Sequence, residues 1–218
     1  MNQADLGVVR AVFEDLGGVQ AVAREQGEGP LVSHLQRTNI QLAAIPVFVR
    51  KGLADTTVND LLEAAQVSRR TFYKYFANKM DVLEGIYCTA VALLLARFRE
   101  LQPGADMESW LRAMVGLFFD YHLSVGPIIR LMQEEALRGD SPLAVHRQQA
   151  HAEMQALLQQ RLALSGKEFP ALTYQALIWA MESASLNLLS RAAPRQEIGE
   201  AKTVLGDLLL AVLCPRTT

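Results

Sequence analysis

Apolar residues recur along this chain at intervals of three and four positions, the spacing that gathers side chains on one face of an α-helix. No stretch keeps the strict alternation of apolar and polar residues that a half-buried strand requires. The pairs Pro103-Gly104 and Gly126-Pro127 interrupt the periodic runs. The pattern therefore predicts an all-α fold class.

Capping residues set the boundaries of the helices expected in the C-terminal part. Asn78, Asp106 and Ser141 each precede a periodic run, and their side-chain oxygens can accept a hydrogen bond from an amide of the first turn. Pro142 follows Ser141 at the first helical position, where proline is favoured. Together these signals predict a C-terminal helical bundle over residues 82–218. Its expected helices cover residues 82–101, 106–125, 128–137, 142–164, 172–190 and 197–213.

The last two of these helices differ in pattern. The helix over residues 197–213 carries a single apolar stripe, with charged residues on the opposite side. The helix over residues 172–190 is apolar on nearly all sides, which requires packing on all sides. It is either the central helix of its own domain, or it packs inward on one face and against a second subunit on the other.

The first 33 residues form a separate acidic segment with five acidic and two basic side chains. The apolar residues from Leu6 to Leu16 fit one amphipathic helix that ends at Gly17-Gly18. Because DNA phosphates would repel the charge of this segment, we expect this N-terminal helical extension, residues 1–33, to pack on the protein.

Composition limits the classes of protein that remain. Half of the 218 residues are apolar and a fifth are charged, which excludes a disordered chain and a disulfide-rich miniprotein. Cys88 and Cys214 fit no metal-ligand spacing, and we expect neither a metal nor a cofactor. Residues 171–189 hold too many polar side chains to span a bilayer, and the N-terminus lacks the features of a signal peptide. We therefore expect a cytoplasmic protein without a membrane partner.

The segment over residues 34–81 has the charge expected of a DNA-binding surface. It holds seven basic and four acidic side chains, whereas the whole chain has a net charge of −2. Thr57 and Ser68 are typical N-cap residues of two short helices, which a turn at Gln66-Val67 joins. This spacing matches a helix-turn-helix motif.

The second short helix has two different faces. Phe72 and Phe76, four residues apart, can form a buried face and leave the polar residues pointing outward. Three basic residues and no acidic residue lie between Val67 and Phe76, whereas a solvated helix face usually carries charges of both signs. Arginine can donate two hydrogen bonds to guanine, and lysine can neutralise a phosphate. The pattern favours binding of double-stranded DNA over a merely solvated face.

Residues 34–80 closely resemble the DNA-binding domain of the TetR/AcrR family of bacterial transcriptional regulators, above all in the run Thr71–Phe76 and in the Asn78-Lys79 pair behind it. The residues similar to that family's first helix and its terminal glycine are Arg37, Ile40, Ala43, Ala44, Phe48 and Gly52. The resemblance implies a helix-turn-helix DNA-binding domain over residues 34–81.

The resemblance also implies roles for single residues. Thr57 would bind a backbone phosphate through its hydroxyl and its amide, residues 68–71 would enter the major groove, and Lys79 would hold a further phosphate. The implied DNA-binding residues are Thr57, Ser68, Arg69, Arg70, Thr71, Tyr73, Lys74 and Lys79. The implied core residues are Ala64, Val67, Phe72 and Phe76.

Three residues depart from the family's pattern. Arg70 replaces a frequent glycine and would add a donor for base edges. Gln66 replaces a glycine of the turn and would strain that turn slightly. Pro46 lies inside the expected first helix, where it removes one amide hydrogen bond, so we expect a bend there.

For the C-terminal domain, the resemblance implies ligand binding and dimerisation, because family members usually enclose a small-molecule pocket there and dimerise through their last two helices. It implies a homodimer that binds a palindromic operator as a repressor and that a small apolar or amphipathic effector releases. The candidate pocket residues are Trp110, Met114, Phe118, His122, Trp179, Glu182 and Asn187. The candidate dimer residues are Leu177, Met181, Ala184, Leu188, Leu205, Leu208, Leu209 and Val212.

The pocket candidates also have plainer interpretations. Those from Trp110 to Phe118 recur every four positions, as in the core of any helical bundle. His122 fits a capping or a core histidine. Glu182 stands among apolar neighbours and can either pair with an arginine or recognise a ligand amine or hydroxyl.

Two alternative functions remain. One is an enzyme that uses the C-terminal domain, but the chain has no nucleophile–base motif and no glycine-rich phosphate loop. The other is a DNA-binding dimer without a small-molecule effector, in which the C-terminal bundle serves only dimerisation or contact with another protein. Saturable binding of a small ligand that weakens DNA binding would distinguish the effector-responsive regulator from this second alternative.

Overall fold

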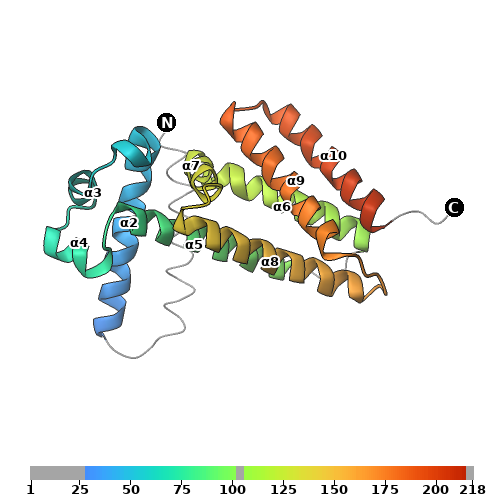
Figure 1. Cartoon of the computed structure of the whole chain (residues 1–218), viewed down its shortest axis with the longest axis horizontal. Helices are drawn as coiled ribbons and strands as arrows, with labels where there is room; N and C mark the ends of the chain where they lie inside the picture. Colours follow the sequence, from blue (N-terminus) through green and yellow to red (C-terminus); the bar gives the residue numbers. More distant parts are fainter. Residues whose placement is uncertain (1–27, 102–105, 215–218) are drawn as a thin grey trace. The chain divides into compact units, whose positions relative to one another are not determined.

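The computed structural model describes residues 28–101 and 106–214, in which nine helices and no strands occur (Figure 1). The predicted all-α fold is confirmed. The amphipathic helix predicted from Leu6 to Leu16 lies outside the described residues, whereas residues 28–33 of the predicted N-terminal extension belong to α2. The helices are α2 (Glu28–Asp55), α3 (Val58–Ala65), α4 (Arg69–Tyr75), α5 (Lys79–Glu100), α6 (Met107–Val125), α7 (Pro127–Ala136), α8 (Pro142–Ala163), α9 (Ala171–Ser190) and α10 (Arg195–Leu213).

The chain forms two compact units. The first unit comprises residues 1–93 and 124–138, and so includes α2, α3, α4, α7 and most of α5. The second unit comprises residues 94–123 and 139–218, with the end of α5, most of α6, and α8 to α10. Residues 124–138 thus group with the N-terminal helices, whereas a linear division at residue 81 places them with the C-terminal ones.

Side chains cap the helices where the sequence predicts them. Asn78, Asp106 and Ser141 each accept a hydrogen bond of 2.9 to 3.3 Å from a backbone amide in the first turn of the helix that follows. Each bond satisfies an amide that has no partner inside its helix. The observed bounds of the six C-terminal helices therefore lie within three residues of the predicted ones.

Helix α2 contains a proline and is broken near its end by a glycine. The backbone stays helical at Pro46, and the non-helical residue is Gly52, with φ 76° and ψ 169°. Glycine adopts this conformation without the strain that a Cβ atom would cause. Thr56 closes the corner, because its hydroxyl donates to the Gly52 carbonyl at 2.6 Å. The break thus lies at Gly52, where the resemblance places the end of the first helix, and not at Pro46.

The core of the first unit forms where α3 and α7 pack against α2 (Figure 1). Its fully buried side chains include Ile40, Phe48, Leu61, Phe72, Phe76, Leu83 and Ile86. One predicted core residue, Ala64, is exposed, and Ala65 is buried in its place. The reason is the register of α3, which turns Ala65 inward together with Leu61, four residues before it. Val67 is half-buried.

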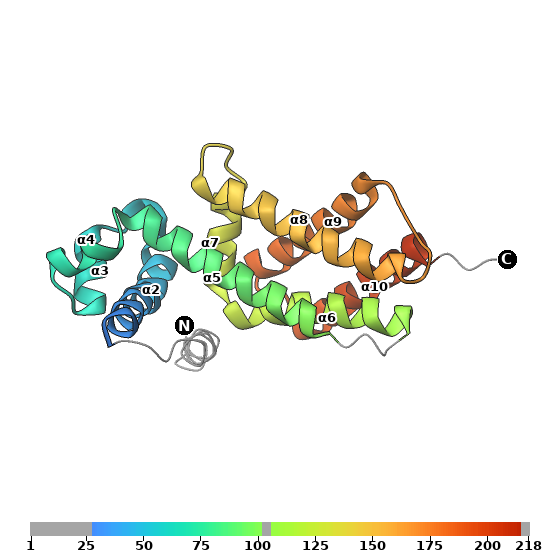
Figure 2. The same cartoon turned by 90° about the horizontal axis from the view of Figure 1, so that it is seen from below.

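In the second unit, α9 packs against both α8 and α10 (Figure 2). The buried side chains of α9 are Tyr174, Leu177, Ile178, Met181, Ser185 and Leu188. On its other side, Leu172 is 63% exposed and Trp179 is 45% exposed. Within the described part of the subunit, α9 is therefore not a central helix covered on every side.

Candidate nucleic-acid interface and ligand cleft

The turn between α3 and α4 contains a residue in the left-handed region. Gln66 has φ 52° and ψ 43°, a conformation that glycine tolerates best. Its amide donates to the carbonyls of Leu62 and Glu63, and the Val67 amide donates to the Leu62 carbonyl at 3.2 Å. These bonds close the end of α3 in the manner of a Schellman motif. The strain predicted at Gln66 is therefore present as left-handed backbone.

Helix α4 has one buried face and one exposed face. The side chains of Phe72 and Phe76 are 0% and 1% exposed, with ring centroids 6.0 Å apart. Thr71 is half-buried, and its amide donates to the Ser68 hydroxyl at 3.1 Å. The structure thus places six of the eight predicted DNA contacts on α4 and its N-cap. Those whose side chains are exposed are Ser68, Arg69, Arg70, Tyr73 and Lys74.

The basic side chains of α4 have different surroundings. Arg69 donates to Asn59 Oδ1 at 2.6 Å, so α3 holds its guanidinium in place. Lys74 Nζ lies 5.0 Å from the centre of the Tyr75 ring. Arg70 makes no hydrogen bond or ion pair with any described residue. The contact with Asn59 could not be predicted from the sequence, because a pair ten positions apart on two helices leaves no periodic signal.

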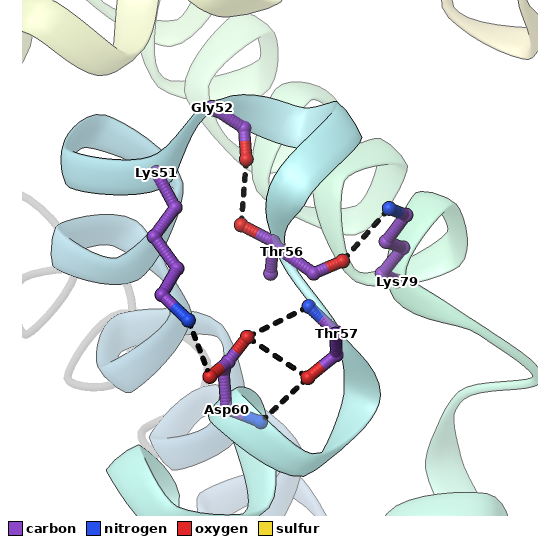
Figure 3. Close-up of polar contacts among 6 residues, drawn as sticks. All are labelled: Lys51, Gly52, Thr56, Thr57, Asp60 and Lys79. Carbon is purple, nitrogen blue, oxygen red and sulfur yellow. Dashed lines mark hydrogen bonds and ion pairs between the residues drawn. The ribbon is translucent and has the colours of Figure 1, made fainter.

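Thr57 is held by a carboxylate of its own chain. Its amide and its hydroxyl both donate to Asp60 Oδ2 at 2.8 Å (Figure 3). Lys51 donates to Asp60 Oδ1 at 2.7 Å. Hydrogen bonds from Lys51 and Thr57 lower the pKa of Asp60 to about 2. A DNA phosphate that used the amide and hydroxyl of Thr57 would therefore have to displace this carboxylate.

Lys79 is the first residue of α5 and contacts the chain at the end of α2 and just after it. Its ammonium group donates to the Ala54 carbonyl and to the Thr56 carbonyl, each at 2.7 Å (Figure 3 shows the bond to Thr56). A lysine ammonium has three donors, so one remains for a phosphate. Lys79 thus joins α5 to the corner after Gly52, a contact 23 to 25 positions away along the chain that the sequence pattern did not predict.

Two of the predicted pocket residues, Trp110 and Met114, line a cleft of about 210 Å³ in the second unit. Phe118 and His122 do not line it and are buried together, with ring centroids 4.0 Å apart. Trp179 and Asn187 are exposed on α9 and also lie outside the lining.

Glu182 belongs to a cluster of charged side chains between α8 and α9. The Arg147 guanidinium donates to both Glu182 carboxylate oxygens, and His151 Nε2 lies 3.4 Å from Oε1. Burial opposes ionisation of Glu182, but the hydrogen bonds from His151 and Arg147 outweigh it and lower its pKa to about 2. Of the two roles predicted for Glu182, pairing with an arginine is the one that is present.

His122 is a buried core histidine, 4% exposed, as its plainer interpretation predicts. Its Nδ1 lies 2.6 Å from the Ser185 hydroxyl oxygen. Burial lowers the pKa of His122 to about 4, against the opposing attraction of Glu182, so the ring is neutral at pH 7.

The predicted dimer residues divide between the core and the surface. Leu208 is 43% exposed, and Ala184 and Val212 are half-buried. The other five are buried within the chain, at most 8% exposed: Leu177, Met181, Leu188, Leu205 and Leu209. The exposed apolar surface of α9 and α10 consists instead of Leu172, Trp179, Val204 and Leu208.

The described residues form neither a metal-ligand cluster nor a membrane-spanning helix. No three of their histidine, cysteine, aspartate or glutamate side chains are grouped so that they could hold a metal ion. None of their helices combines the length and the apolar character needed to cross a membrane.

Residues 40–86 match the family model described as "Bacterial regulatory proteins, tetR family". The match covers the C-terminal half of α2, all of α3 and α4, and the start of α5. It therefore contains the whole of the candidate DNA-binding helix-turn-helix described above.

Curated relatives are similar over part of their length. The chain is 38% identical over 95 residues to the HTH-type transcriptional regulator TcmR from Streptomyces glaucescens, which is 42% of this chain and 40% of TcmR. It is 29% identical over 87 residues to the HTH-type transcriptional activator FasR from Mycolicibacterium smegmatis, 39% of this chain and 40% of FasR. The aligned part thus spans 40% of the length of these two relatives.

Solved structures of similar fold cover most of the chain. The fatty acid degradation regulator FadR from Bacillus halodurans has a TM-score of 0.69 at 19% identity, over 88% of this chain and 100% of that one. Salmonella enterica GusR has a TM-score of 0.69 at 19% identity, over 87% and 99%. A tetR-family transcriptional regulator from Streptomyces coelicolor has a TM-score of 0.67 at 21% identity, over 83% and 82%. Residues 40–86 are thus a DNA-binding domain of the tetR family of bacterial regulatory proteins, and the chain shares the fold of these solved structures.

Proposed function

We propose that this chain is a DNA-binding transcriptional regulator that binds a palindromic operator as a homodimer and represses transcription. The surface of α4 carries the proposal. Phe72 and Phe76 anchor the helix in the core, and the exposed face holds three basic residues and no acidic one. Such a face can enter a major groove, where arginine reads guanine and lysine neutralises phosphate.

The exposed apolar side chains of α9 and α10 support a homodimer. Leu172, Trp179, Val204 and Leu208 are 43 to 65% exposed on two helices that pack against each other. Exposed apolar side chains on neighbouring helices are typical of an interface with another protein. In the proposed dimer a second copy of the chain covers them, and the twofold symmetry matches a palindromic operator.

The cleft lined by Trp110 and Met114 supports regulation by a small apolar or amphipathic effector. Such an effector would release the operator if it bound more tightly to a conformation that fits DNA poorly. The alternative without an effector predicts that no small ligand changes the affinity for DNA.

Selection from a pool of random DNA duplexes by the purified full chain tests the proposal. We expect a palindromic sequence with half-sites about one helical turn, roughly 10 base pairs, or a multiple of it apart. Its dissociation constant should be about 10⁻⁸ to 10⁻¹¹ M and should rise steeply with salt concentration. Recovery of duplexes without a common sequence would contradict operator binding, and a monomer in sedimentation would contradict the dimer.

A further inference from the structure

The cleft of the second unit lies where α5 ends, α6 begins and α8 approaches its C-terminus. Five of its apolar lining side chains are at most 6% exposed, whereas Leu164 is 76% exposed; the five are Phe98, Trp110, Met114, Met154 and Leu158. Its volume of about 210 Å³ is smaller than the roughly 300–1,000 Å³ of pockets for drug-sized ligands. The cleft therefore suits a single apolar chain or a small ring system.

Two arginines give this apolar cleft a positive side. The guanidinium carbon of half-buried Arg161 lies 5.7 Å from the centre of the Trp110 ring, a cation–π contact that positions the charge beside the aromatic wall. Arg99 stands exposed at the rim and donates to Glu153 at 2.5 Å. Among the described residues that line the cleft, none is acidic.

We infer that this cleft binds a small amphipathic anion, with its apolar part against Phe98, Met154 and Leu158 and its carboxylate on Arg161. The planar guanidinium group can donate two parallel hydrogen bonds to a carboxylate. A neutral apolar ligand can accept no such pair of hydrogen bonds from the guanidinium group. A cationic ligand would be repelled. As a statement about regulation, this inference rests on the proposed function and narrows its effector to an anionic class.

Trp110 can report binding directly. The chain has two tryptophans, and Trp179 lies on α9 outside the cleft lining, so the W179F protein emits from Trp110 alone. We would titrate the W179F full chain with decanoate and with decyltrimethylammonium, both below their micelle concentrations and without DNA. We expect a saturable change with decanoate, at one site per chain, and an affinity at least about tenfold higher than for the cation.

Substitutions at Arg161 test the carboxylate contact. R161M keeps a long apolar side chain and removes the charge, and should weaken decanoate binding about tenfold or more. R161K keeps the charge without the planar group and should give an intermediate affinity. If R161M does not fold, R161K alone tests the carboxylate contact. The matched control is R130M, which changes an exposed arginine of α7 and should alter the affinity by less than about twofold.

Equal binding of the anion and the cation, no saturable signal, or equal binding by R161M and the parent would each overturn the inference. Because these titrations contain no DNA, they are independent of the duplex selection. Decanoate binding together with failed selection would refute the proposed function and leave the cleft assignment standing. Operator binding without decanoate binding would support the proposed function and refute the cleft assignment. If decanoate weakened operator binding by W179F but not by the W179F/R161M double variant, binding in this cleft would regulate binding to DNA.

Discussion

Arg69 and Arg70 are neighbours on α4, yet their side chains make different contacts within the chain. Arg69 already donates to Asn59, whereas Arg70 makes no hydrogen bond or ion pair with the described residues. Arg70 can therefore donate to a base edge without giving up a bond inside the chain. Arg69 must exchange its bond to Asn59, or keep it and approach DNA in that fixed position. The two arginines should consequently differ in how much each contributes to sequence recognition.

We expect Arg70→Ala to relax the sequence preference at one base pair in each half-site and to cost about 1–3 kcal/mol of binding free energy, since a bidentate contact to guanine would be lost. Repeating the duplex selection with this variant measures the preference. Arg130→Ala, on exposed α7, is the control. A selected sequence identical to that of the unchanged protein would show that Arg70 does not read a base.

Lys79→Met should lower both DNA affinity and stability. It should weaken binding to all duplexes about equally, because a phosphate contact carries no sequence information. It also removes the two bonds to the Ala54 and Thr56 carbonyls, which should lower the free energy of unfolding by about 1–2 kcal/mol. Urea unfolding and a salt titration measure the two effects. Unchanged stability would leave Lys79 with a role in DNA binding alone. Lys79→Arg should restore part of the DNA affinity and part of the free energy of unfolding.

Among the helical elements, the turn after α3 carries a conformational cost that a single substitution can remove. Gln66 has φ 52°, a region that costs roughly 1–2 kcal/mol for a residue with a Cβ atom. Gln66→Gly removes this strain but gives the unfolded chain more freedom. We expect a net gain of about 0.5–1 kcal/mol in the free energy of unfolding, measured in urea. Gln160→Gly, in the interior of α8, should instead destabilise by a similar amount. A loss of stability in Gln66→Gly would mean that the glutamine side chain itself supports the turn.

Helices α9 and α10 hold the proposed dimer together through residues that are exposed in one subunit. Leu208→Arg places a charge within this apolar surface, so we expect the dimer to dissociate at micromolar concentration. Leu137→Arg, at a leucine after α7 that is 54% exposed against 43% for Leu208, should leave the dimer intact. Sedimentation measures the oligomeric state of both variants. If Leu208→Arg remained dimeric, the dimer would have to form through another surface.

The sequence was informative about the elements for a specific reason. Caps such as Asn78 and Ser141 act on neighbouring residues, so helix starts can be predicted locally. The orientation of α9 could not be predicted, because a helix that is apolar all round gives no sign of which side its neighbours cover. The pattern of α6 could not separate cleft from core either. Trp110 lines the cleft, whereas Phe118, on the same apolar stripe, lies in the core. The Lys51–Asp60 contact escaped prediction because it joins two different helices.

On the scale of the whole molecule, His122 makes the stability of the fold depend on pH. Burial lowers its pKa to about 4 from the ordinary 6.5. Between these values the unfolded chain binds a proton that the folded chain does not. The free energy of unfolding therefore falls as the pH falls, by up to about 1.4 kcal/mol per pH unit. Glu182, with its pKa lowered to about 2, adds a further loss below about pH 4.5.

His122→Gln should reduce the loss of stability between pH 6.5 and pH 4.5, because glutamine can hydrogen-bond to Ser185 without titrating. Urea unfolding at several pH values measures the slope. The unchanged protein is the reference, and an equal slope in the two proteins would assign the acid sensitivity to other groups.

The carboxylate that Asp60 places on Thr57 has a consequence for competition among anions. Chloride, sulfate or buffer phosphate gains little at this helix start, because an anion already occupies both donors at no cost in translational entropy. A phosphate of a bound duplex has a different advantage, since the rest of the interface holds it nearby at a high effective concentration. We therefore expect the start of α3 to bind dilute free anions weakly, and to bind a phosphate when that phosphate is part of a bound DNA duplex.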